Sequence, residues 1–360
     1  MTVRVLVVDD SATMRALITR KLEQEPDLEV VGTARDALEA RQLIKALDPD
    51  VVTLDIEMPG MDGLSFLAKI MELRPTPVIV VSGSTGPGAQ ATVRAMQLGA
   101  INCYAKASAS RSMVDDDGGE LASLVREASH VRLRPRAAPS ARVVTRKPAP
   151  NPARSASVSA RGEPAVIAIG SSTGGVEALH SLLARFPADC PPTLIVQHVS
   201  GCFADAIASS LDRVAAPLVR LAQGGDLLQR GEVLLAPGDD AHLVLDPPRG
   251  AGSGRTRLKR ADPVSGHRPS VDVLFNSVAK AAGSTAQGVI LTGMGRDGAS
   301  GLKAMADAGA DTIAQDKESC VVFGMPRAAI EVGAAKITLP LDRIAVHIFA
   351  GSRQLTPSTH

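Results

Sequence analysis

The chain has few aromatic side chains and no long apolar run. Aromatic residues make up 2% of its 360 residues, and tryptophan is absent. Stacking platforms for single-stranded nucleic acid are therefore not expected. No apolar run reaches the ~18 residues of a membrane-spanning helix, so no membrane insertion is expected. The N-terminus enters a strand pattern without the apolar segment of a signal peptide, which favours a cytoplasmic protein.

The chain also has few cysteines and almost no net charge. The four cysteines lie far apart, and no two of them form a C-x-x-C pair. We therefore expect neither a zinc site nor a disulfide framework. Lys plus Arg number 39 and Asp plus Glu number 38, which gives a net charge of +1. This balance argues against a protein that binds nucleic acid through bulk positive charge.

The composition changes sharply at residues 131–163. This stretch is rich in Arg, Pro, Ala and Ser, has one acidic residue, Glu163, and shows no apolar periodicity. Such a segment cannot bury a core, so we expect a linker. A basic tail for nucleic acid is the weaker alternative, because ordinary spacers often carry basic charge. We therefore expect domains at 1–130 and 164–350, with a tail at 351–360.

Strands and helices alternate before the linker. Apolar strand patterns occur at 3–8, 28–33, 50–55, 77–83 and 101–105, and helical patterns separate them. A further helix is expected at about 120–130. This (βα)5 order predicts a flavodoxin-like α/β domain whose parallel sheet carries helices on both faces.

The alternation resumes after the linker. Strands are expected at 164–170, 193–198, 287–292 and 311–316, with helical patterns between them. The stretch from about 217 to 260 is rich in strand patterns broken by Gly and Pro, and it is interpreted as a β-rich insertion. The second domain is therefore predicted to be a doubly wound, hydrolase-like α/β domain with a mostly parallel sheet.

Five polar side chains follow the strands of the first domain. They are Asp9 and Asp10 after the first strand, Asp55 after the third, Ser82 after the fourth and Lys106 after the fifth. Ligands of open parallel sheets bind at this edge. Converging carboxylates need a cation, and oxygen ligands select Mg²⁺. A single aspartate here is more often a helix cap, but the full set favours a phosphoryl site in which an aspartate accepts the group.

A Gly-rich turn joins the first strand and helix of the second domain. The sequence Gly170-Ser-Ser-Thr-Gly-Gly175 matches G-x-S-x-G in the strand–turn–helix context that a nucleophilic serine, here Ser172, requires. The alternative is a turn that binds phosphate or a dinucleotide. That alternative is weakened because G-x-G-x-x-G and the lysine of a P-loop are both missing.

A serine nucleophile needs a base and an acid that orients it. His198 ends the strand at 193–198, and Asp297 follows the strand GVILTG, so both emerge at the same sheet edge as Ser172. Alone, each is more often structural, but the three together favour a Ser-His-Asp hydrolase. His242 and His267 remain possible bases. The order Ser-His-Asp differs from that of the α/β-hydrolase fold.

Residues 1–130 resemble the receiver domain of two-component response regulators. The resemblance rests on Val8-Asp-Asp-Ser11, Asp55-x-x-Met-Pro-Gly-Met-Asp-Gly63, Val81-Ser82 and Lys106. It implies that Asp55 is phosphorylated, that Ser82 and Lys106 contact the phosphoryl group, and that Mg²⁺ is the cofactor. The implied metal ligands are Asp9, Asp10, Asp55 and the backbone carbonyl of Glu57.

Two positions depart from the receiver pattern. Ala107 stands where receivers usually carry proline after the lysine. Cys103 stands where many receivers carry an aromatic residue that changes rotamer on activation. We therefore do not expect the usual aromatic signal in this chain.

Residues 164–350 resemble the catalytic domain of the CheB family, the chemotaxis protein-glutamate methylesterases. The resemblance rests on IGSSTGG, QH, HRPSVDVLF, GVILTGMGRDG and CVVFGMP. It implies Ser172 as nucleophile, His198 as general base and Asp297 as its orienting acid. Thr173 and the backbone around Met294 would lie near the oxyanion. Ser171 occupies a position where alanine is common.

The two resemblances together imply a phosphorylation-activated serine esterase. It would hydrolyse glutamyl γ-methyl esters on the cytoplasmic part of chemoreceptors, release methanol and deamidate receptor glutamines. A chemotaxis histidine kinase would supply the phosphoryl group, the esterase step would need no cofactor, and we expect a monomer. The rivals are a DNA-binding response regulator and an inactive receptor-binding adaptor.

Overall fold

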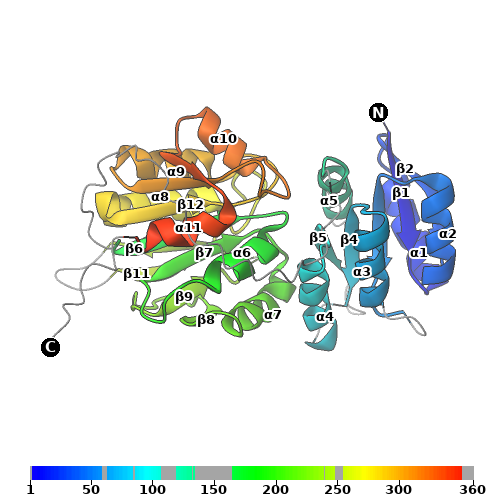
Figure 1. Ribbon diagram of the computed structural model, residues 1–360, viewed down its shortest axis with the longest axis horizontal. Helices are drawn as coiled ribbons and strands as arrows, with labels where there is room; N and C mark the ends of the chain where they lie inside the picture. Colours follow the sequence, from blue (N-terminus) through cyan, green and yellow to red (C-terminus); the bar gives the residue numbers. More distant parts are fainter. Residues whose placement is uncertain are drawn as a thin grey trace, which may run out of the picture.

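The computed structural model describes residues 2–58, 63–83, 86–106, 119–131, 133, 164–238, 240–247 and 254–350. Two separate parallel sheets dominate it, a five-stranded sheet in the N-terminal part and a seven-stranded sheet in the C-terminal part (Figure 1). Most of the predicted linker and the whole predicted tail lie outside the described residues.

The first sheet has the strand order β2-β1-β3-β4-β5. Every neighbouring pair is parallel, so the flavodoxin-like prediction is confirmed. The strands are β1 (Val3–Val8), β2 (Leu28–Ala34), β3 (Val51–Asp55), β4 (Val78–Ser82) and β5 (Asn102–Ala105).

Helices cover both faces of the first sheet because its strands are apolar on both sides. They are α1 (Ala12–Glu23), α2 (Ala37–Leu47), α3 (Gly63–Leu73), α4 (Gly86–Gln97) and α5 (Glu120–Ser129). Helices α1 and α5 pack with Val5 and Val7 on one face. Helices α2, α3 and α4 pack with Leu6 and Val8 on the other. The alternation along β1 therefore divides the core into two layers.

The second sheet has the order β14-β13-β12-β6-β7-β9-β8, and all its pairs are parallel. Its strands are β6 (Val166–Ser171), β7 (Thr193–Gln197), β8 (Leu218–Leu221), β9 (Glu232–Leu235), β12 (Ala286–Ile290), β13 (Asp311–Gln315) and β14 (Ile337–Leu339). The chain starts in the middle at β6, proceeds to one edge, and then returns to β12 on the other side of β6. This doubly wound order creates a switch point between β6 and β12, where such sheets bind ligands.

The predicted β-rich insertion at 217–260 was wrong in part. Strands β8 and β9 extend the main sheet, and only β10 (His242–Asp246) and β11 (Arg255–Lys259) form a separate antiparallel pair. Strand β14 was also missed, since the strand at 311–316 was expected to close the domain. Apolar runs indicate a strand, but they do not identify its partner.

Helices also cover both faces of the second sheet. They are α6 (Gly175–Leu183), α7 (Gly201–Asp212), α8 (Val271–Ala282), α9 (Ala299–Asp307), α10 (Met325–Glu331) and α11 (Leu341–Ile348), with a 3-10 turn η1 at Gly283–Thr285. Helices α6, α7 and α11 pack with Ile167 and Ile169, whereas α8, α9 and α10 pack with Val166 and Ala168. None of the described helices is long and apolar enough to cross a membrane.

The first domain lies against the carboxyl edge of the second sheet (Figure 1). Gln97 at the end of α4 donates a hydrogen bond to His180 of α6 at 2.8 Å and to Ser210 of α7 at 3.2 Å. Met294 and Val322, from loops that follow β12 and β13, pack with the apolar cluster of the first domain. The contact therefore covers the edge where the predicted nucleophile, base and acid emerge.

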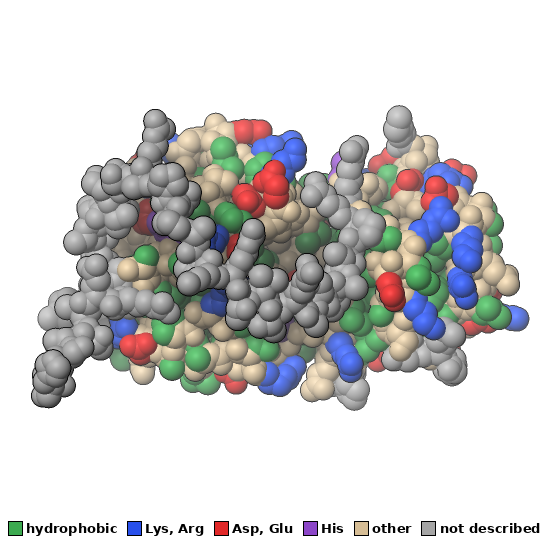
Figure 2. All heavy atoms as spheres, in the orientation of Figure 1, with side chains coloured by type: hydrophobic (Ala, Val, Ile, Leu, Met, Phe, Trp, Pro, Cys, Tyr) green, Lys and Arg blue, Asp and Glu red, His purple; other side chains and the backbone are tan. Residues whose placement is uncertain are grey.

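Charges are mixed on the surface, as the balanced composition predicts. On the face drawn in Figure 2, the described basic and acidic side chains are interspersed over both domains. That distribution differs from the one-sided basic footprint of a nucleic-acid-binding surface.

Candidate functional site

Ser172 lies at the switch point of the second sheet, directly after β6. Its backbone N–H donates to Thr292 O at 3.0 Å, which ties the turn to the end of β12. Gly174 has φ 75°, a left-handed conformation that glycine adopts without strain, and it begins α6. The turn is thus held by the neighbouring strand on one side and by a helix N-terminus on the other. Ser172 is buried with 5% of its surface exposed.

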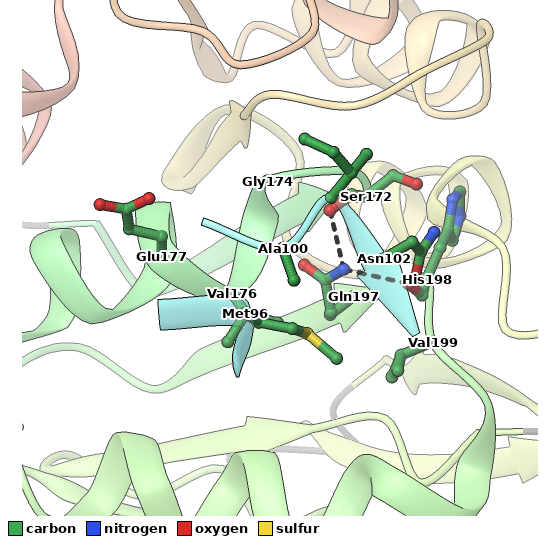
Figure 3. A pocket seen from close by; sticks show the side chains of 11 residues that line it. Met96, Ala100, Asn102, Ser172, Gly174, Val176, Glu177, Gln197, His198 and Val199 are labelled. Carbon is green, nitrogen blue, oxygen red and sulfur yellow. Dashed lines mark hydrogen bonds between the residues drawn. The ribbon is translucent and has the colours of Figure 1, made fainter. Parts of the chain in front are cut away.

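Gln197, at the end of β7, links this turn to the neighbouring strand. Its amide accepts a hydrogen bond from Ser171 Oγ at 2.7 Å and donates to the carbonyls of Ser172 and His198 at 2.9 and 3.0 Å; Figure 3 draws the last two. A Cβ at Gly175 would lie 2.1 Å from Gln197 Oε1 and 2.8 Å from the Cβ of Ser171, so a side chain here would displace Gln197 or the turn. Gln197 was not predicted to have a role of its own, although it forms half of the QH motif.

The predicted base and acid are in contact. His198 Nε2 donates to Asp297 Oδ2 at 2.8 Å. The second ring nitrogen, Nδ1, is buried and has no hydrogen-bond partner among the described residues. His198 and Ser172 line the same pocket (Figure 3). Nδ1 is therefore the nitrogen available to take a proton there.

Asp297 sits on the N-terminus of α8. It accepts hydrogen bonds from Ser270 Oγ at 2.8 Å and from the backbone N–H groups of Val271 and Asp272 at 2.8 and 3.0 Å. Burial raises the pKa of Asp297, but the hydrogen bond and charge of His198, with these further donors, outweigh burial and hold its pKa below the usual value. The carboxyl group is therefore ionised and fixed in orientation.

The residues predicted near the oxyanion are Thr173, which follows Ser172, and the backbone around Met294, which follows β12. Among the described residues, no backbone carbonyl accepts the N–H groups of Thr173 and Met294. Gly293, next to Met294, donates its N–H to Val322 O at 3.1 Å, so it is not free for this role. Thr173 and Met294 thus remain the available donors.

A glutamate of the first domain reaches this turn. Thr173 Oγ1 donates to Glu127 Oε2, on helix α5, at 3.3 Å. Burial raises the pKa of Glu127, and the hydrogen bond from Thr173 and the charge of His198 oppose that shift. The pocket at Ser172 and His198 is also lined by Ile101 and Asn102 of the first domain. The sequence contains no signal for this contact, because it joins two domains across the predicted linker.

The two alternative histidines have different surroundings. His242 Nδ1 accepts from Ser270 N–H at 3.1 Å and its Nε2 donates to Asp262 O at 3.0 Å, so both nitrogens are occupied. His267 stacks its ring on His198, with centroids 3.8 Å apart and an interplanar angle of 10°. Neither therefore replaces His198 as the base.

The acidic residues of the first domain also converge. Carboxylate oxygens of Asp9, Asp10 and Asp55 lie within 4.8 Å of one another. Lys106 Nζ lies 2.7 Å from Asp55 Oδ2 and 3.0 Å from Asp9 Oδ2. Burial raises the pKa of Asp9, and the hydrogen bond and charge of Lys106 only partly offset this. The three carboxylates thus have Lys106 beside them, and Arg15 binds the backbone carbonyls of Asp9 and Asp10.

This cluster fits a divalent cation. Asp9 Oδ2 is buried, and Lys106 Nζ lies 3.0 Å from it. The carboxylates of Asp9, Asp10 and Asp55 are close enough together to share one ion. The donors are all oxygens, which Mg²⁺ prefers.

The remaining predicted residues of this edge lie around Asp55. Glu57 donates its backbone N–H to Asp55 Oδ1 at 2.9 Å. Ser82 Oγ donates to Gly88 O at 3.3 Å, and Lys106 N donates to Ser82 O at 2.8 Å. Cys103 is buried in β5, and Ala107 lies outside the described residues.

Comparison with known proteins agrees with this geometry. The family model for CheB methylesterase matches residues 167–348. The chain belongs to the CheB methylesterase family. A second model, for the response regulator receiver domain, matches residues 5–116.

Individual relatives of this CheB-family chain cover nearly its whole length. A protein-glutamate methylesterase/protein-glutamine glutaminase of Caulobacter vibrioides is 51% identical over 96% of this chain and 97% of its own. One from Bordetella pertussis is 48% identical over 96% of each chain. The crystal structure of the Thermotoga maritima CheB methylesterase catalytic domain matches with a TM-score of 0.50 and 36% identity, over 53% of this chain and 99% of that one.

Proposed function

We propose that this chain is a phosphorylation-activated protein-glutamate methylesterase and protein-glutamine glutaminase that acts on chemoreceptors. The observation that carries the proposal is the state of His198, whose Nε2 is bound to Asp297 while its buried Nδ1 is free in the pocket of Ser172. The names of the full-length relatives support the reaction. A seven-stranded doubly wound output domain also disfavours a DNA-binding response regulator.

In this reaction Ser172 Oγ attacks the γ-carbonyl of a glutamyl methyl ester. His198 Nδ1 takes the serine proton, and Asp297 stabilises the imidazolium that forms. The N–H groups of Thr173 and Met294 would donate to the oxyanion, a contribution of ~3 kcal/mol for each such donor. His198 then protonates the departing group, which leaves as methanol from the ester or as ammonia when the substrate is glutamine. Water hydrolyses the acyl-enzyme, which frees Ser172 and leaves a glutamate side chain on the receptor.

The first domain would carry the control. We assign residues 1–130 to regulation, 131–163 to the linker and 164–350 to catalysis, with the tail at 351–360. A chemotaxis histidine kinase would phosphorylate Asp55, and Mg²⁺ held by Asp9, Asp10, Asp55 and the carbonyl of Glu57 would neutralise phosphoryl charge. Lys106 and Ser82 would then contact the phosphoryl oxygens. The substrate would be the cytoplasmic part of a chemoreceptor. The enzyme would act in the cytoplasm as a monomer.

In the resting state the first domain would block the substrate. A receptor helix must reach Ser172, but residues of β5 and α5 occupy that approach. One group of the first domain that contacts the turn is the carboxyl group of Glu127, the same chemical group that the reaction forms. Its hydrogen bond to Thr173 thus places a product-like side chain beside the nucleophile. Phosphorylation of Asp55 would weaken this docking.

Methanol release from a methylated receptor fragment tests the proposed reaction. The Ser172→Ala variant should lose ~10⁴-fold or more of the activity, because it removes the nucleophile. Ser171→Ala is the matched control, since the Ser171 hydroxyl hydrogen-bonds to Gln197, and this variant should retain activity within tenfold. Activity of Ser172→Ala near the wild-type rate would contradict the proposal.

A further inference from the structure

A single segment contacts both His198 and Asp297. This segment, residues 267–272, leads into α8. His267 stacks on the imidazole of His198 with centroids 3.8 Å apart and planes 10° from parallel. Ser270 and the two residues after it donate to Asp297. The base and its acid are thus held by neighbouring residues of one short stretch.

His267 contacts the base but does not line the described pocket. The pocket at Ser172 includes His198 and does not include His267. The near-parallel planes mean that His267 presents its ring face, not a ring nitrogen, to His198. It therefore cannot relay a proton to His198 through a direct hydrogen bond.

We propose that His267 is a positioning residue for the esterase reaction, one that fixes the plane of His198 and remains uncharged so that the transferred proton stays on His198. The inference rests on the proposed function, because it assigns His267 a part in the same proton transfer.

The first part follows from geometry. The hydrogen bond from Nε2 to Asp297 fixes one corner of the imidazole ring and leaves it able to swing about that corner. The stacked ring of His267 closes one face and removes that freedom. Nδ1 then stays in the plane that points toward the pocket. Loss of such orientation at a reacting group costs rate even when binding is intact.

The second part follows from charge. Two parallel imidazoles at 3.8 Å cannot both carry a proton without strong repulsion. Burial and the charge of His198 lower the pKa of His267 to about 4, although Asp297 acts in the opposite direction. These two groups are the charges that act on it most strongly. His267 is consequently neutral near pH 7, and the proton from Ser172 has only one imidazole to occupy.

Three substitutions separate shape from charge. His267→Phe keeps a flat, uncharged ring; His267→Arg keeps a flat group but adds a permanent charge; His267→Ala removes the stack. Each full-length variant is phosphorylated with a small phosphodonor, and methanol release is measured against pH. We expect His267→Ala to lower kcat ~10–100-fold with little change in KM. His267→Phe should recover most of that loss.

The charged variant has a distinct signature. In His267→Arg, repulsion should lower the kinetic pKa of the base in the pH profile of kcat/KM, and His198 should titrate at lower pH by NMR of its imidazole. His267→Phe should show the wild-type profile. A purely structural role would change stability in all three variants but would leave the pH profile unshifted.

Specific results would overturn the proposal. A kcat of His267→Ala within twofold of wild type would contradict the orienting role, and an unshifted profile in His267→Arg would contradict the need for neutrality. If His267→Ala does not fold, the comparison of His267→Phe with His267→Arg still tests the proposal. If the Ser172→Ala variant were as active as the wild type, the proposed reaction would be contradicted instead. The NMR titration of His198 does not depend on that reaction, so it would still test the role of His267.

Discussion

Asp297 shows how strongly a single residue is specified by its partners. Four donors surround its two oxygens, namely His198 Nε2, Ser270 Oγ and two backbone N–H groups of α8. Each oxygen accepts two of them. The side chain at this position must therefore accept hydrogen bonds at both of its terminal atoms and donate none.

The Asp297→Asn variant should lose activity severely, because its amide N–H₂ would face two donors whichever way it is placed. We expect kcat to fall by ~10²–10⁴-fold, since the wrong tautomer of His198 would also be favoured. Methanol release by the phosphorylated enzyme measures this. A loss below tenfold would mean that His198 does not depend on Asp297 for its orientation.

Asp55 is the residue on which regulation should depend. We expect Asp55 to incorporate label from a small phosphodonor only in the presence of Mg²⁺, because the carboxylate oxygens of Asp9, Asp10 and Asp55 lie within 4.8 Å of one another and repel without a cation. Asp55→Asn should abolish the label, which is followed by phosphate-affinity electrophoresis. Label that forms equally well with EDTA would contradict the metal site.

The residues of the site differ in how well the sequence predicts them. Ser172, His198 and Asp297 each follow a parallel strand, so strand periodicity alone places them at one edge. Glu127 and His267 reach the same place from another domain and from a loop. No periodicity or spacing predicts such long-range contacts, because the paths of loops depend on packing that only the folded chain defines.

At the scale of elements, the site depends on how closely the loop after β12 approaches the nucleophile turn. A Cβ at Gly293 would lie 2.3 Å from Met325 Sδ and 2.7 Å from the Cβ of Ser172. Both distances are shorter than any van der Waals contact. The loop can therefore deliver Met294 and Asp297 only if residue 293 has no side chain.

Gly293→Ala should displace the Ser172 turn and reduce activity by ~10²-fold, the cost of a shift of about 1 Å. Gly224→Ala is the matched control, since the nearest atom to its Cβ would be 4.0 Å away. Initial rates and thermal unfolding of both variants provide the test. Equal rates in the two variants would show that the close approach is not needed.

Elements themselves were largely predictable, whereas their partners were less so. The strand at 3–8 matches β1, because a buried parallel strand is apolar throughout. The strands β8 and β9 were detected in the segment at 217–260, but their place in the main sheet was not, since a short apolar run is compatible with any neighbour. Strand β14 has only three residues, too few for a periodic signal.

At the scale of the molecule, the two domains meet over the predicted active site. The contact combines the polar cluster of Gln97, His180 and Ser210 with apolar packing of Val322 and the hydrogen bond of Glu127 to Thr173. The tether makes such docking effectively intramolecular, so individually weak contacts suffice. A change from 99% closed to 50% closed requires only ~2.7 kcal/mol.

Blocking by the first domain predicts the order of three resting rates. A fragment that begins near residue 164 should release methanol faster than the unphosphorylated full-length chain, because nothing covers Ser172. Glu127→Ala should raise the resting rate of the full-length chain toward that of the fragment, since it removes the hydrogen bond to Thr173. Ser123→Ala, an exposed position of the same helix, is the control and should leave the rate unchanged.

The phosphodonor gives the second half of that test. It should stimulate the full-length chain, stimulate Glu127→Ala less, and leave the fragment unaffected, because the fragment lacks Asp55. If the first domain instead activated the site directly, the fragment would be no faster than the resting chain, and Glu127→Ala would not raise the resting rate. Side-by-side initial rates on one soluble receptor substrate therefore distinguish release of a block from direct activation.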